Sequence, residues 1–286
     1  MPIIASGSRA STLHYICNHA SFVHGALPTT LDSSAFQATA PAAAHGHEHD
    51  GPDPLALGAK GDWQPQVLLI DAGTETDCYG ADITRTMPVG NGGRFTPEAR
   101  DIYALVLHMQ KEAEKMTRAG VHWDTIQLAT HRLLVRGLLE LGIFRGGDEE
   151  TILRSGISTG FFPHGLGHSI GLDVHDVPSA SKPNEATNET IPDESRQTPE
   201  LYTFLRLRLP LASGMLITIE PGCYFSPHLL KRWRGSEFID PAVLTRYEPV
   251  GGVRIEDVVL VERDGCRNLT SAVREVADVE RLCSGA

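Results

Sequence analysis

The stretch QVLLIDAGTETDCYGADITRTMPV, residues 66–89, predicts two strands joined by a turn. QVLLIDAG is a short apolar run, and ADITRTMPV predicts its hairpin partner or a close neighbour. With a turn near residues 75–79, Asp71 and Asp82 fall on facing strands, and both carboxylates can point to one face. Alone the pair is a weak signal, because aspartates at strand ends often serve as turn or capping groups. Arg85 is also available as a structural partner for either one.

Two amphipathic helices are predicted next along the chain. Thr96 is the expected N-cap of the first, Pro97 its first position and Gly120 its stop signal. The second begins near Asp124 and runs to Gly142. Apolar residues recur at helical spacing in both, so each should face the core. Surface or capping roles are expected for three histidines of this region: His108, His122 and His131.

The rest of the chain predicts a third short helix, a loop and two β segments. The helix starts at Asp148, and the polar, Pro-rich residues 179–200 predict the loop. MLITIEPGCYF (215–225) and GGVRIEDVVLVE (251–262) contain the β-branched runs typical of strands. The order of strands, helices and strands indicates an α+β fold rather than a βαβ repeat.

Histidines gather in the segment HGLGH, residues 164–168. His164 and His168 are four residues apart, but the two glycines make a regular helix improbable and allow the backbone to approach a ligand closely. His175 follows in LDVHD. Each of these imidazoles could instead satisfy buried backbone groups.

Two glutamates lie at the ends of the apolar β segments. Burying the carboxylate of Glu220 or Glu256 is costly unless it is paired or bound to a metal. Arg254 is two residues before Glu256 and could neutralise one of the glutamates instead. With Asp71, Asp82 and His168, these glutamates complete a five-residue set of the type that holds two divalent cations.

Composition excludes several classes of function. The 286 residues have a formal charge of −11 and only 6% aromatic residues, which argues against a nucleic-acid partner. We expect no membrane span, because no run reaches about 18 apolar residues. The five cysteines contain no CxxC pair, which predicts reduced thiols, a cytoplasmic location and no thiolate zinc site.

Residues 21–64 differ in composition from the rest of the chain. They are rich in Ala, Pro, Gly and His and show no period, so we expect a disordered, low-complexity surface insertion. Its HGHEHD stretch, residues 45–50, could bind a stray transition metal, but nothing nearby would hold the imidazoles rigid.

The motifs together resemble a known family. DAG, ADITRT, HGLGH, DVHD, TIEPG and GGVRIED occur in the order found in pita-bread metallopeptidases. ASGSRASTLHY (5–15) and FFPHGLGHSIGLDVHD (161–176) are similar to the Xaa-Pro aminopeptidase and prolidase branch. The resemblance implies a curved antiparallel sheet flanked by helices, in one catalytic domain over residues 1–286. The N-terminal domain usual in relatives would be missing.

The resemblance also implies the roles of the five metal ligands. Asp71 binds one metal, Asp82 and Glu256 bridge both, His168 completes one shell and Glu220 binds the other ion. The family usually prefers manganese, which suits four carboxylates, while the imidazole leaves cobalt or zinc open. A bridging water or hydroxide would attack the carbonyl of the scissile bond.

Further roles follow from the same resemblance. Glu220 is similar to the family's proton shuttle. His14, His164 and His175 match histidines that orient substrate and stabilise the oxyanion. Arg254 matches a position near the metals, where it would steady a bridging carboxylate or meet substrate.

The implied activity is removal of the N-terminal residue from peptides with a penultimate proline, with a homodimer left open. Within the same chemistry, an Xaa-Pro dipeptidase is the alternative. A catalytically silent pita-bread protein that binds peptides or proteins is a further alternative. Such relatives lose metal ligands, whereas this chain keeps all five.

Overall fold

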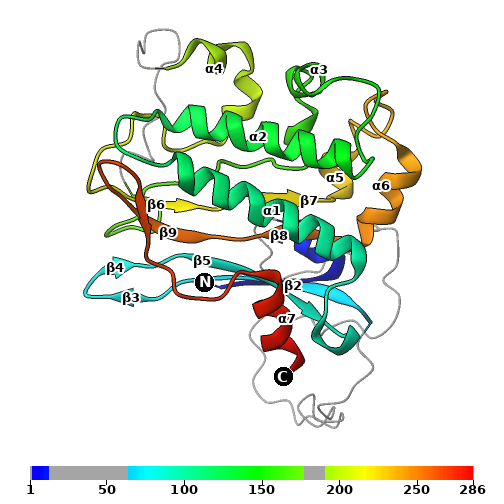
Figure 1. The fold of residues 1–286 in the computed structure, drawn as a ribbon, viewed down its shortest axis with the longest axis horizontal. Helices are drawn as coiled ribbons and strands as arrows, with labels where there is room; N and C mark the ends of the chain where they lie inside the picture. The colour runs from blue at the N-terminus through cyan, green and yellow to red at the C-terminus, as the bar shows by residue number, and fades with distance from the viewer. Residues whose placement is uncertain (1, 13–63, 177–190, 286) are drawn as a thin grey trace, which may run out of the picture.

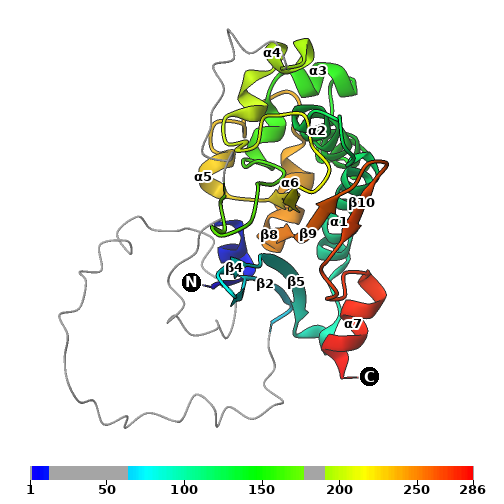
Figure 2. The same ribbon diagram turned by 90° about the vertical axis from the view of Figure 1, so that its left-hand side faces the viewer.

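The computed structural model describes residues 2–12, 64–176 and 191–285. The expected insertion at 21–64, except Gln64, therefore lies outside the described residues, as does His14. Figures 1 and 2 show two helices lying across one side of a group of antiparallel strands. Apolar residues from both helices and the strands form one buried core.

The predicted strand pair is confirmed. An antiparallel sheet has the order β1-β2-β5, and Asp71 is opposite Thr84 in its register. A tight hairpin connects β2 to β5, and its turn residues Asp77 and Cys78 have φ of 52° and 66°. The strands of this part are β1 (Ile3–Ser6), β2 (Gln66–Ala72), β3 (Glu75–Thr76), β4 (Tyr79–Gly80) and β5 (Ile83–Val89).

The two long helices are α1 (Pro97–Met116) and α2 (Trp123–Glu140), which pack on each other. The side chain of Thr96 caps α1 as predicted, by accepting a hydrogen bond from the backbone N–H of Ala99. The helix ends before the expected stop at Gly120, because Thr117 adopts an extended conformation.

Each predicted C-terminal β segment is divided into two short strands. The first breaks at Glu220 and Pro221, and the second at Ile255 and Glu256. β6 pairs with β9, whereas β7 pairs with β8. An antiparallel bridge between Thr84 and Glu256 joins the two parts of the strand layer. The strands are β6 (Leu216–Ile219), β7 (Gly222–Tyr224), β8 (Gly252–Arg254), β9 (Asp257–Val261) and β10 (Cys266–Asn268).

Shorter helices surround this framework. Asp148 caps the predicted third helix, α3 (Glu149–Arg154). The loop expected at 179–200 is partly wrong: within its described portion α4 (Asp193–Gln197) forms, and acidic residues at its start favour helix. The other helices are α5 (Pro227–Leu230), α6 (Pro241–Tyr247) and α7 (Val276–Ser284), with 3₁₀ turns η1 (Gly7–Ser11), η3 (Asn91–Gly93), η4 (Ile157–Gly160), η5 (Pro199–Tyr202) and η6 (Glu248–Val250).

The three histidines in or beside the long helices differ in their burial and contacts. The ring of His122 caps α2 by accepting from the N–H of Asp124, and His108 is exposed, both as expected. The surface or capping role expected for His131 is wrong, because its ring is fully buried between Gln127 and Ser158. Its place in the helical period puts it on the core face of α2. In the part of the chain that the structure describes, no helix is long and apolar enough to cross a membrane.

Candidate metal centre

Three of the predicted ligands converge on one point. Asp82 begins the approach to β5, His168 lies in the HGLGH segment, and Glu256 lies at the break between β8 and β9. One potential ligand atom from each lies within 4.8 Å of the others. His168 Nε2 is 3.6 Å from Asp82 Oδ2 and 4.0 Å from Glu256 Oε1. Segments far apart in sequence thus meet where the two parts of the strand layer join.

The backbone around His168 fixes its ring. Gly167 lies so close to β6 that a Cβ there would come within 1.9 Å of the Thr218 carbonyl oxygen. The carbonyl oxygens of Leu166 and His168 accept hydrogen bonds from the backbone N–H groups of Glu220 and Thr218, which agrees with the close approach expected of the glycines. His168 Nδ1 is 3.1 Å from the Ser169 carbonyl oxygen, a contact that assigns the proton to Nδ1 and leaves a lone pair on Nε2.

Glu220 lies beside the same imidazole. It directly follows β6, and its Oε1 is 3.4 Å from His168 Nε2. Its other oxygen, Oε2, is 3.9 Å from His164 Nδ1. His175 packs against the same imidazole, with its ring centroid 4.4 Å from that of His168. The structure therefore places His164 and His175 against the ligand cluster.

Asp71, the fifth candidate ligand, is held in place by an arginine. Arg254 Nη2 donates to Asp71 Oδ2 at 2.7 Å, and its Nη1 donates to the hydroxyl of Tyr224 at 3.0 Å. The ion pair of Arg254 with a glutamate that the sequence left open is thus not formed; the partner is Asp71. Arg85 does not pair with Asp71 or Asp82 as considered, because its guanidinium binds Asp257 at 2.6 Å.

The electrostatics of this cluster favour bound cations. Burial raises the pKa of Glu220 to about 8, and the pKa of Glu256 is also well above its usual range, for the same reason and because of the neighbouring carboxylates. Burial and nearby Asp82 raise the pKa of Asp71, although Arg254 opposes this. One guanidinium cannot balance four carboxylates. The donor set therefore fits divalent cations, which would stabilise the ionised form of every ligand.

Comparison with known proteins agrees with this geometry. The model of metallopeptidase family M24 matches residues 1–263. The chain belongs to metallopeptidase family M24. Its M24 fold confirms the expected α+β, pita-bread architecture, and the family implies divalent metal ions.

Relatives of this M24 chain carry consistent names. It is 41% identical over 285 residues to a probable Xaa-Pro aminopeptidase of Metarhizium robertsii, covering 98% of this chain and 50% of the relative. Against the corresponding protein of Aspergillus fumigatus it is 39% identical, covering 99% and 51%. The chain thus spans about half the length of the curated relatives it matches.

Solved structures of aminopeptidases are also similar to this chain. Proline aminopeptidase P II from Yersinia pestis is similar, with a TM-score of 0.67 and 28% identity, covering all of this chain and 48% of that one. Aminopeptidase PepP of Pseudomonas aeruginosa has a TM-score of 0.66 and 30% identity, with coverages of 99% and 47%.

Two residues of the M24 site were missed in the sequence. Thr84 donates to Glu256 Oε2 at 2.6 Å, and the hydroxyl of Tyr224 lies 2.8 Å from His164 Nε2. Both are fully buried. Thr84 comes two residues after Asp82, which directly precedes β5, and this spacing is the one sequence signal that the two share a face.

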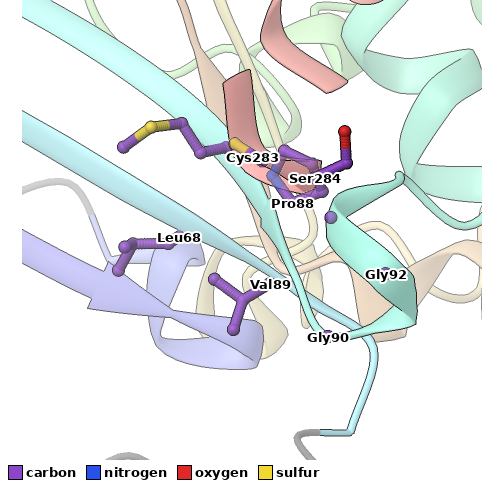
Figure 3. Close-up of a pocket in the computed structure, with 9 residues that line it drawn as sticks. Leu68, Pro88, Val89, Gly90, Gly92, Cys283 and Ser284 are labelled. Atoms are coloured by element: carbon purple, nitrogen blue, oxygen red, sulfur yellow. The ribbon is translucent and has the colours of Figure 1, made fainter. Parts of the chain in front are cut away.

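A pocket at the far ends of the same strands is separate from this centre. Figure 3 shows Leu68, Val89 and Cys283 of α7 among the residues that line it, and none of the candidate ligands does. Helix α7 approaches closely here because Gly93 has no side chain; a Cβ would meet the backbone of Cys283 at 2.4 Å. The pocket therefore belongs to helix packing rather than to the M24 centre.

Proposed function

We propose that this chain removes the N-terminal residue from peptides whose second residue is proline. The observation that carries the proposal is the convergence of Asp82, His168 and Glu256 within 4.8 Å, with Glu220 and Asp71 beside them. The names of the M24 relatives supply the substrate class. The described residues, in this proposal, belong to a single catalytic domain.

Five side chains would hold two divalent cations in this centre: Asp71, Asp82, His168, Glu220 and Glu256. Four carboxylates and one imidazole suit manganese best, with cobalt or zinc as substitutes. The cations would supply Lewis acidity, which lowers the pKa of water and polarises a peptide carbonyl. Asp82 and Glu256 are the proposed shared ligands of both ions.

The chain's own groups would handle the proton and the substrate. Glu220, whose Oε2 is 3.9 Å from His164 Nδ1, would take a proton from water and release it to the leaving proline nitrogen. The ring of His164 is fixed by the Tyr224 hydroxyl at Nε2 and by the Gly165 carbonyl oxygen at Nδ1, and it is proposed to orient substrate and stabilise the oxyanion. His175, whose ring packs against that of His168, is proposed to share this role, and His14 is proposed as a further substrate contact.

Arg254 is proposed to hold the candidate ligand Asp71 in position and to lie near the substrate. It is buried and links Asp71, Tyr224 and Thr84 through its three nitrogens. A guanidinium with all its nitrogens engaged cannot swing away, so the position of Asp71 is fixed relative to β5.

The cellular setting is part of the proposal. The cysteines at 78, 223, 266 and 283 are free thiols, which supports a reducing cytoplasm. A homodimer is also proposed, and light scattering of the purified chain measures its mass.

The activity is tested with purified chain, Mn²⁺ and an Xaa-Pro-Yaa tripeptide. We expect release of the first residue, and loss of at least about a hundredfold in kcat for Glu220→Gln. An Xaa-Pro dipeptide run in parallel measures dipeptidase activity. A chain that binds two Mn²⁺ ions yet cleaves neither peptide contradicts the proposal, and one that binds no metal supports a silent binding protein.

A further inference from the structure

Gln110 is a polar side chain on the core-facing surface of α1. It has no exposed surface. Its Nε2 donates to two backbone carbonyl oxygens, that of Ile219 at 3.4 Å and that of Ile255 at 3.3 Å. Its Oε1 accepts a hydrogen bond from Arg274 Nη1 at 3.1 Å.

The orientation of this amide is determined by its partners. Arg274 can only donate, so it must face the amide oxygen, and the two carbonyls can only accept, so they must face the NH₂ group. Both amide hydrogens are therefore used, one for each carbonyl. The amide forms a link between two strand segments that are 36 positions apart in sequence.

The two carbonyls occupy corresponding places in the strand layer. Ile219 directly precedes Glu220, and Ile255 directly precedes Glu256. At these two points the chain leaves one strand and begins the next, so the regular ladder is interrupted. Ile219 still pairs with Asp257 at the end of the β6–β9 ladder, whereas Ile255 lies between β8 and β9. A single side chain of α1 donates to the carbonyl oxygen of each, directly before the two glutamates.

We propose that Gln110 is a positioning residue of the metal centre: it fixes the separation of Glu220 and Glu256 and thereby sets metal affinity. It touches neither carboxylate and acts through the backbone immediately before each one. This inference rests on the proposed metal-binding function.

Arg274 strengthens this link. It donates to Gln110, to Glu114 on the same helix, and to Asp257 Oδ2 at 2.7 Å, the residue directly after Glu256. Glu256 is thus held from both sides, through the carbonyl before it and the carboxylate after it. Residues that orient ligands in this way typically change metal affinity by about 10-fold to 100-fold when mutated.

The test compares Gln110→Met with Thr130→Val in the full chain. Methionine keeps the length and volume of glutamine but has no donor. Thr130 is also buried, and its hydroxyl bonds the Ile126 carbonyl within α2, so its loss removes a buried hydrogen bond without involving the site. Calorimetric titration of chelator-stripped protein with Mn²⁺ gives the dissociation constants, and visible spectra of Co²⁺-loaded protein report ligand geometry.

For Gln110→Met we expect Mn²⁺ affinity to fall by about 10-fold to 100-fold and the Co²⁺ spectrum to shift. Thr130→Val should match the wild type in both. Gln110→Asn keeps the NH₂ group but withdraws it by about 1.5 Å, so an intermediate loss is expected. Wild-type affinity and spectrum in both Gln110 variants would overturn the inference while leaving the proposed function intact.

The remaining outcomes are also decisive. A wild-type chain that binds no Mn²⁺ overturns the proposed function and this inference with it. If neither Gln110 variant folds while Thr130→Val does, Gln110 is a requirement of the fold, and its assignment to the metal centre is rejected.

Discussion

At the scale of single residues, the candidate ligands depend on a few neutral donors. Thr84 is the clearest example. Its hydroxyl donates to Glu256 and at the same time accepts from Arg254 Nε at 3.0 Å. One hydroxyl therefore fixes the rotamer of a carboxylate and the position of a guanidinium.

Replacing this hydroxyl tests its contribution. Thr84→Val keeps the shape of the side chain but leaves Glu256 without its donor, so we expect a loss of about 10-fold to 100-fold in Mn²⁺ affinity. Titration calorimetry measures the loss, with Thr130→Val as the matched control. Equal affinities in the two variants would show that the hydroxyl does not orient Glu256.

His131 predicts a pH dependence of stability away from the metal centre. Burial lowers its pKa to about 3, so the folded protein keeps this ring neutral while the unfolded chain takes up a proton below about pH 6.5. Stability is therefore complete above pH 6.5 and falls as the pH is lowered, by about 2 kcal/mol between pH 6.5 and 5.

Urea unfolding at several pH values measures this dependence. His131→Gln has no titrating ring, so its stability should change less over this range than that of the wild type. Parallel curves for the two proteins would contradict the assignment.

Residue type and order, together with the family motifs around them, were enough to propose the candidate ligands, but not what surrounds them. A carboxylate in an apolar strand is conspicuous in a sequence, because its burial needs a reason. The partners are not conspicuous: Arg254 could have paired with several acids, and only the register places Asp71 beside it. His131 was misjudged because a buried imidazole needs a polar pocket, and its Ser158 partner is 27 residues away.

At the scale of elements, the HGLGH segment depends on close backbone contact with β6. In Gly167→Ala the new Cβ would lie 1.9 Å from the Thr218 carbonyl oxygen, so the segment must move and take His168 with it. We expect a loss of about 2 kcal/mol in unfolding free energy and weaker Mn²⁺ binding. Gly235→Ala is the control, because a Cβ there would meet no atom within 4 Å beyond its chain neighbours. Wild-type metal affinity in Gly167→Ala would show that the contact is dispensable.

Elements with strong local signals were predicted and those set by tertiary contact were not. The cap at Thr96, the apolar period of α1 and the strand run before Asp71 are local. The breaks at Glu220 and Glu256 are not, because their β-branched neighbours favour continuous strands. Helix α4 is five residues long and polar, and it was missed because it has no apolar face in the sequence. Its one buried residue, Ser195, is covered by tertiary contacts.

At the scale of the whole molecule, the two parts of the strand layer meet at an excess of negative charge. β2 and the residue directly before β5 contribute the aspartates, and the β6–β9 part contributes the glutamates. Folding without cations must therefore keep some carboxyls protonated. The cations would bind the folded state and stabilise it, as any ligand of the native state does.

Metal removal should make stability depend on pH in a definite direction. In chelator-treated protein the pKa of Glu220 is raised to about 8, whereas the unfolded chain loses this proton near 4.5. The raised pKa stabilises the folded state at low pH, and the effect is lost as the pH rises towards 8. For Glu220 alone this amounts to about 2.5 kcal/mol between pH 5.5 and 7.5. With Mn²⁺ bound the carboxylates are ionised and paired, and binding strengthens as protons leave.

The gap in unfolding free energy between Mn²⁺-loaded and chelator-treated protein should therefore widen as the pH rises from 5.5 to 7.5. Urea titrations of both forms at the two pH values measure it. In Glu220→Gln the chelator-treated form should lose much of its pH dependence, because the amide cannot titrate and a major source of repulsion for Glu256 is gone. A gap that narrows with rising pH would mean that the buried carboxyls are not the groups that the cations neutralise.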